Sequence, residues 1–137
     1  MKSKEHWEKV YTAKAPDNVS WFQPHAEMSM RLIHDTGLGC DAAIIDVGGG
    51  ASTLVDDLLD DGYRALTVLD LSAAALNETL RRLGTKGESV RWMEADITQA
   101  VFEPYSFDVW HDRAVFHFLT TDEDRKAYVK QVLRALK

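Results

Sequence analysis

Two kinds of hydrophobic pattern alternate along this chain, and this alternation constrains the fold more than any other feature. Four short apolar runs, most of them with β-branched residues, are typical of buried strands. They cover residues 42–47, 65–69, 90–93 and 107–110. Three intervening segments repeat their apolar residues at helical spacing. They cover about 52–61, 72–84 and 121–137. Alternating strands and helices predict a mainly parallel sheet covered on both faces, an α/β fold.

A helical segment is expected before the first strand. The pattern predicts a short helix at 4–11 and a second one from about 24 to 36, with Gly37 and Gly39 beyond its end. The length of 137 residues suits a single domain. We therefore expect one domain over 1–137, made of a helical part at about 1–39 and an α/β core at about 40–137.

Composition narrows the class of protein. The net charge of −6 argues against a broad surface for nucleic acid, which needs clustered basic residues. Cys40 is the single cysteine, which excludes an internal disulfide and fits a reducing compartment. The N-terminus carries no apolar run typical of a signal peptide, and no stretch is long enough to span a membrane. We expect a cytoplasmic protein that has no contact with membranes.

Glycines and acidic residues follow the predicted strands. Gly48, Gly49 and Gly50 come after the first strand, where glycine lets a ligand approach the backbone and the next helix offers unpaired N–H groups. Asp70 stands at the tip of the second strand, where a carboxylate can accept hydrogen bonds from both hydroxyls of a ribose. Ligands bind at this edge of parallel sheets. Each signal is weak alone, but their shared register predicts a nucleotide-like cofactor site.

These motifs resemble those of a known family. Asp46-x-Gly48-x-Gly50, Asp70 and the tripeptide Glu94-Ala95-Asp96 are similar to the first three motifs of class I S-adenosylmethionine-dependent methyltransferases, and Phe107-Asp108-Val109 is similar to the fourth. The resemblance covers the chain from about residue 44. It implies a Rossmann-like three-layer sandwich whose first four strands lie in the order 3-2-1-4. It also implies S-adenosyl-L-methionine as cofactor and S-adenosyl-L-homocysteine as product.

The resemblance also assigns roles to residues. It implies that Gly48 and Gly50 lie against the methionine part of the cofactor, and that Asp70 binds the ribose. Asp96 would bind the adenine amino group and the Ile97 backbone a ring nitrogen, whereas Asp46 would orient the glycine loop. The full set of implied cofactor contacts in the core is Asp46, Gly48, Gly49, Gly50, Asp70, Leu71, Asp96 and Ile97. Ser52 replaces the third glycine of the family, a mild departure.

The N-terminal segment carries a further resemblance. The sequences His6-Trp7-Glu8-Lys9-Val10-Tyr11 and Val19-Ser20-Trp21-Phe22 are similar to the start of small lysine-directed methyltransferases, in which this segment folds over the cofactor as a lid. Trp21 is then expected to contact the cofactor, because an aromatic face attracts a cation. The alternative is that these aromatic residues simply anchor an apolar helix face.

Two other functions remain open. A nicotinamide-dependent oxidoreductase shares this architecture, but its Gly-x-Gly-x-x-Gly motif requires glycine or alanine where this chain has Thr53. A non-catalytic binding or scaffold domain could keep the fold without turnover. We favour a methyltransferase acting on an unidentified small molecule or protein side chain.

Catalytic candidates follow the predicted fourth strand. Methyl transfer is an in-line displacement that depends on positioning and on exclusion of water, and it needs a base only if the acceptor arrives protonated. His111 and Asp112 could deprotonate or orient an acceptor, and Arg113 could bind an acidic one. Equally, Arg113 could form an ion pair and His117 could be a half-buried structural residue. The sequence contains no Cys/His cluster typical of a metal site.

The expected strand order leaves an edge uncovered. The family order is 3-2-1-4-5-7-6, and this sequence supplies only the first four strands. The strand at 107–110 would then be an open edge, and part of a sheet face would be exposed. We therefore expect either a fragment of a longer enzyme or a chain that associates with a second copy through this edge.

Overall fold

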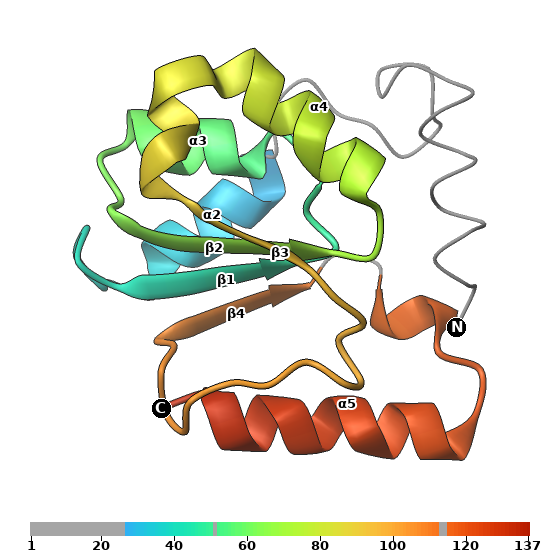
Figure 1. Cartoon of the computed structure of the whole chain (residues 1–137). Helices are drawn as coiled ribbons and strands as arrows, with labels where there is room; N and C mark the ends of the chain where they lie inside the picture. The colour runs from blue at the N-terminus through green and yellow to red at the C-terminus, as the bar shows by residue number, and fades with distance from the viewer. Residues whose placement is uncertain (1–26, 51, 113–114) are drawn as a thin grey trace.

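A computed structural model describes residues 27–50, 52–112 and 115–137 of the chain (Figure 1). The strands are β1 (Ala43–Val47), β2 (Ala65–Asp70), β3 (Arg91–Glu94) and β4 (Val109–Asp112). The α-helices are α2 (Glu27–Asp35), α3 (Leu54–Asp60), α4 (Ala73–Leu83) and α5 (Asp122–Ala135). Two 3-10 segments complete the described part, η2 (Gly84–Ser89) and η3 (Phe116–Phe118).

The four strands form one parallel sheet in the order β3-β2-β1-β4. This order confirms the predicted Rossmann-like fold. The register places Asp46 of β1 beside His111 of β4, and Asp70 of β2 beside Glu94 of β3. All four carboxyl ends therefore lie at the same edge of the sheet.

Helices cover both faces of the sheet, as Figure 1 shows. On one face, α2, α3 and α4 pack on alternate residues of the strands, around a core that includes Ile44, Leu58 and Val68. On the other face, α5 and the segment before β4 pack around Ile45, Leu69 and other buried residues. The expectation of an exposed sheet face is therefore wrong, because α5 reaches back across the sheet and covers it.

Hydroxyl side chains cap the N-termini of two helices. Ser72 Oγ accepts a hydrogen bond from the N–H of Ala75 at 3.1 Å, and Thr121 Oγ1 accepts one from the N–H of Asp124 at 3.1 Å. Each hydroxyl satisfies a donor that has no partner within the first turn of its helix. These bonds therefore fix where α4 and α5 begin.

The fourth strand lies at a different position from the predicted one. It begins at Val109 instead of Phe107 and ends at Asp112. The backbone of Phe107 pairs instead with Leu136, just after α5, in a single parallel bridge. Asp108 is held against the start of β1, because its side chain accepts from the N–H of Ala43 at 2.8 Å. The edge is thus closed at Phe107, whereas among the described residues β4 itself has a strand neighbour only on the β1 side.

Some predictions fall outside the described residues. These are the helix at 4–11, the cofactor contact by Trp21 and the role of Arg113. In the part of the chain that the structure describes, no helix is both long and apolar enough to cross a membrane.

Candidate functional site

The glycine loop after β1 rests directly on neighbouring side chains. Gly48 has a left-handed backbone (φ +77°), and its N–H donates to the carbonyl of Leu69 at 2.7 Å. A Cβ on Gly49 would lie 2.1 Å from Oδ2 of Asp46, and one on Gly50 would lie 2.8 Å from Oδ2 of Asp70. Side chains in this loop would displace two carboxylates, so glycine is required for the loop to pack against them.

Asp46 lies beneath the loop as a buried acid. The residue is 3% exposed, and Oδ1 is 2.8 Å from Nδ1 of His111. Oδ2 is also buried, and among the described residues it has no hydrogen-bond partner. A buried carboxylate oxygen without a donor is costly. Because this oxygen lies directly under Gly49, Asp46 can act on a ligand through the loop and through its charge, and not by direct contact.

Asp70 connects the glycine loop to the start of α4. Its Oδ2 accepts from the N–H of Gly50 at 3.0 Å, and its Oδ1 accepts from the N–H of Ser72 at 2.9 Å. Both carboxylate oxygens of Asp70 thus accept a backbone N–H, one from the glycine loop and one from the start of the next helix. Leu71 follows Asp70 and is half-buried. The second acid thus lies at the tip of β2, as predicted, and touches the loop that follows β1.

Asp96 is held in a turn after β3. Its Oδ1 accepts from the N–H of Thr98 at 2.9 Å and from the Thr98 hydroxyl at 2.7 Å. Ile97 is buried, and its carbonyl accepts from Gln131 Nε2 of α5 at 3.0 Å. This turn is therefore tied to α5, and Asp96 is half-buried at the same edge of the sheet as the other acids.

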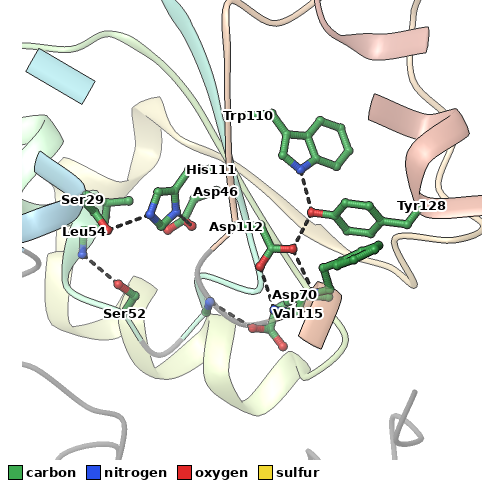
Figure 2. Close-up of polar contacts among 12 residues, drawn as sticks. Ser29, Asp46, Ser52, Leu54, Asp70, Trp110, His111, Asp112, Val115 and Tyr128 are labelled. Atoms are coloured by element: carbon green, nitrogen blue, oxygen red, sulfur yellow. Dashed lines mark hydrogen bonds and ion pairs between the residues drawn. The ribbon is translucent and has the colours of Figure 1, made fainter. Parts of the chain in front are cut away.

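The two catalytic candidates that the structure describes point to opposite faces of the sheet (Figure 2). Both lie within β4 instead of following it, and successive side chains of a strand alternate between faces. His111 points toward Asp46 and α2, whereas Asp112 points toward Tyr128 of α5. The two side chains therefore do not contact the same group, and a joint action on one acceptor proton is not supported by this arrangement.

Asp112 organises the loop that follows β4. It accepts from the N–H of Val115 at 2.7 Å, from the N–H of Phe116 at 3.0 Å and from the hydroxyl of Tyr128. Burial raises the pKa of Tyr128, and the hydrogen bond to Asp112 raises it further, although a hydrogen bond from Trp110 opposes the shift. Tyr128 thus remains a protonated donor, and Asp112 is committed to structural bonds.

The loop after β4 touches the glycine loop. A Cβ on Gly48 would lie 2.1 Å from Cγ2 of Val115, so the two segments are in direct contact. Because Asp112 fixes the N–H of Val115, the position of the glycine loop depends on the loop beside it. His117 lies in η3, within this same region of the chain.

Sequence reasoning missed three residues at this edge: Ser29, Tyr128 and Val115. Ser29 Oγ is 2.8 Å from Nε2 of His111. It occupies the buried stripe of α2 together with Ile33, and a serine in an apolar position was the available signal. No local pattern points to Tyr128 or Val115, because their contacts depend on how α5 and β4 pack.

Ser52 explains the departure from the family pattern. Its hydroxyl accepts from the N–H of Leu54 at 3.0 Å, at the start of α3. A serine here closes the turn by a side-chain bond where the family uses glycine. Within the described ranges, no group of three or more His, Cys, Asp or Glu residues could hold a metal ion.

Comparisons with known proteins agree with this geometry. A family model described as "Methyltransferase domain" matches residues 44–137. The human eEF1A lysine and N-terminal methyltransferase is 26% identical over 134 residues, covering 98% of this chain and 19% of the relative. The zebrafish (Danio rerio) EEF1A lysine methyltransferase 2 is 28% identical over 145 residues, covering 98% of this chain and 62% of the relative.

A solved structure shares the fold. The 1,6-didemethyltoxoflavin-N1-methyltransferase of Burkholderia thailandensis, solved with bound 1,6-didemethyltoxoflavin and S-adenosylhomocysteine, has a TM-score of 0.64 and 20% identity. The similarity covers 98% of this chain and 53% of that one. The chain therefore spans about half of this neighbour's length, and less than two thirds of either relative named above.

Proposed function

Because this chain belongs to the methyltransferase domain family, we propose that it binds S-adenosylmethionine and transfers the methyl group to a nucleophilic acceptor. The observation that carries the proposal is the glycine loop, which rests on the buried carboxylates Asp46 and Asp70. A loop without side chains, bordered by acids, suits a ligand that approaches the backbone and carries positive charge.

The cofactor fits this site in three respects. Its sulfonium and ammonium groups are cationic, and the buried Asp46 carboxylate lies directly beneath the glycine loop. Its ribose carries two hydroxyl donors, and the Asp70 carboxylate lies at the tip of β2 beside the same loop. The family resemblance assigns the adenine amino group to Asp96 and a ring nitrogen to the Ile97 backbone, and it includes Leu71 among the cofactor contacts; these residues follow β3 and β2 at the same edge.

The protein's contribution to the reaction is mainly positional. When bound, the cofactor would supply an electrophilic methyl group, which an acceptor nucleophile would take in line with the sulfur of S-adenosylhomocysteine as the leaving group. Asp70 and Asp96 would fix the adenosine, and the glycine loop would fix the methionine part. Val115 and the Asp112-bound loop would form a wall beside that loop and exclude water from it.

The acceptor is proposed only as a class. The chain is similar to proteins named as lysine and N-terminal methyltransferases and to a methyltransferase of a small heterocycle, so an amine or ring nitrogen is the first class to assay. His111, Asp112 and Arg113 stay predictions as acceptor-directed residues. Trp21 stays a prediction as a cofactor contact. From the sequence patterns and the composition, we also propose a helical lid at about 1–39, an α/β core at about 40–137 and a cytoplasmic location.

Calorimetric titration with S-adenosylhomocysteine tests the cofactor assignment. The chain should bind it, and Asp70→Asn should weaken the affinity about tenfold or more, because the amide lacks the charge that strengthens bonds to the ribose. Asp60→Asn, which changes an exposed acid that pairs only loosely with Lys86, should leave the affinity unchanged. Equal affinities of the Asp70 variant and the parent chain would contradict the ribose assignment.

The same titration separates the alternative functions. Binding of NAD in place of S-adenosylhomocysteine would identify the oxidoreductase alternative. Binding of S-adenosylhomocysteine without methyl transfer to amines, carboxylates, phenols, thiols or candidate proteins would favour the non-catalytic domain. We expect binding and turnover, measured as transfer of a labelled methyl group.

A further inference from the structure

Three side chains from three different elements form a hydrogen-bonded chain beneath the glycine loop (Figure 2). Asp46 of β1 is 2.8 Å from Nδ1 of His111 on β4, and Nε2 of His111 is 2.8 Å from the hydroxyl of Ser29 on α2. Asp46 is 3% exposed and Ser29 is 8% exposed, and the His111 side chain is 14% exposed. The chain is thus almost entirely removed from solvent.

The protonation state of His111 decides the direction of the bonds. With an ionised carboxylate and a neutral imidazole, Nδ1 donates to Asp46 and Nε2 accepts from the Ser29 hydroxyl. With a protonated imidazole, both nitrogens donate and the Ser29 oxygen accepts. Both ring nitrogens are occupied in this way, which leaves His111 poorly placed to take a proton from a methyl acceptor.

The same three residue types form the nucleophilic triad of many hydrolases, and that possibility can be weighed here. A nucleophilic serine must be accessible and must lie beside donors that stabilise an oxyanion. Ser29 lies inside a helix on its buried stripe, beside Ile33 in the helical repeat. The arrangement therefore fits side-chain positioning better than hydrolysis.

We infer that Ser29 and His111 are positioning residues, which hold the Asp46 carboxylate beneath the glycine loop and so couple the docking of α2 to cofactor affinity. This inference rests on the proposed cofactor site. His111 fixes Oδ1 of Asp46, and this leaves Oδ2 directly under Gly49, where a Cβ would lie 2.1 Å away. If the imidazole turns, the carboxylate turns with it, and the loop above loses its support.

Ser29 makes this coupling depend on α2. Its hydroxyl can fix the plane of the imidazole only while α2 is packed against the sheet. Ile33 holds α2 in that position, because it is buried in the same core as Ile44 and Leu54. Ligand binding to the loop should in turn stabilise the packed position of α2, because coupling between two sites is reciprocal.

A double-mutant cycle tests the inference. Ser29→Ala should weaken S-adenosylhomocysteine binding about threefold to tenfold, and His111→Ala about tenfold or more. The double variant should bind as weakly as His111→Ala alone, because Ser29 acts through His111. His111→Gln keeps a donor and an acceptor, so it should retain more affinity than His111→Ala. Thr36→Ala removes a hydroxyl whose bonds are local, to the carbonyl of Ile33 and from the N–H of Leu38, and should bind as the parent does.

Hydrogen exchange supplies a second readout that needs no turnover. In the protein without ligand, amides of residues 27–35 should exchange faster in Ser29→Ala than in the parent or in Thr36→Ala. Additive effects of the two substitutions, or parental affinity and exchange in Ser29→Ala, would overturn the inference while leaving the proposed function intact. Absence of S-adenosylhomocysteine binding in the parent chain would overturn the proposed function and this inference together.

Discussion

Gly48 combines two constraints that act at a single residue. Its backbone is left-handed, and the space where a Cβ would lie is filled by Val115. Gly49 and Gly50 are also constrained by their neighbours, because a Cβ on Gly49 would meet the carboxylate of Asp46 and one on Gly50 would meet that of Asp70. Substitutions here are therefore expected to change both stability and ligand binding.

Gly48→Ala should lower the free energy of unfolding by at least about 1–2 kcal/mol, because an alanine is disfavoured at this backbone angle, and the contact with Val115 adds to the loss. Urea denaturation measures the change. Gly39→Ala is a matched control, since nothing lies within 4 Å of its Cβ position and its backbone is not left-handed. A Gly48 variant as stable as the Gly39 variant would contradict the described loop.

At the scale of elements, β4 connects the helices on the two faces of the sheet through adjacent residues. His111 connects the sheet to α2, and Asp112 connects it to α5 through Tyr128. Trp110 Nε1 donates to the Tyr128 hydroxyl at 2.8 Å and completes the connection to α5. The position of α5 therefore depends on a protonated phenol.

The dependence on pH follows from Tyr128. Its folded-state pKa lies above the ordinary value of 10.0, because burial and Asp112 disfavour the phenolate. Its contribution to stability is thus complete below pH 10 and is lost as the pH rises above that value, by up to about 1.4 kcal/mol per pH unit. Urea denaturation between pH 9 and 12 should show this decline, and Tyr128→Phe should show a smaller one. Tyr63, whose pKa burial also raises, remains in both proteins and accounts for part of the slope.

The sequence predicts these elements well and their contacts poorly. The strands and their parallel arrangement follow from local patterns, whereas the strand order follows from the family resemblance, and both are confirmed. The start of β4 was placed two residues early, because an apolar Phe107 reads as part of the strand although its backbone pairs with Leu136. That error placed His111 and Asp112 in a loop and concealed their opposite directions.

The candidate site also contains residues that the sequence predicts and contacts that it does not. The acids and glycines at strand ends are predictable because the carboxyl edge of a parallel sheet gathers them. The Ser29 contact is not predictable, since it spans 82 residues and requires α2 to pack against β4. Tyr128 is a comparable case, because a tyrosine on α5 has no local mark of its bond to Asp112.

At the scale of the whole molecule, the edges of the sheet determine association. Among the described residues, β4 has a strand neighbour only on the β1 side, and the bridge at Phe107 protects one end of its outer edge. Unpaired strand edges favour pairing with another chain. Two predictions stay open for the remaining part of β4, which are pairing with a second copy of this chain and pairing with a further strand of a longer enzyme.

Sedimentation velocity over a range of concentrations tests pairing with a second copy. The sedimentation coefficient should rise with concentration, and amides of residues 109–112 should become more protected from hydrogen exchange as it rises. Amides of β1, which pairs on both sides already, should not change and serve as the internal control. A coefficient and a protection pattern independent of concentration would show that the edge does not pair.

The link from Trp110 to the glycine loop also gives the molecule an optical reporter. The indole N–H bonds to Tyr128, whose hydroxyl holds Asp112, which in turn fixes Val115 against Gly48. Indole emission responds to its hydrogen-bond partner and to nearby charge, so occupation of the loop should change the fluorescence of Trp110. Trp92 donates instead to the carbonyl of Gly87, beside the opposite edge strand. The emission lost in Trp110→Phe would thus isolate a signal that follows ligand binding without any added label.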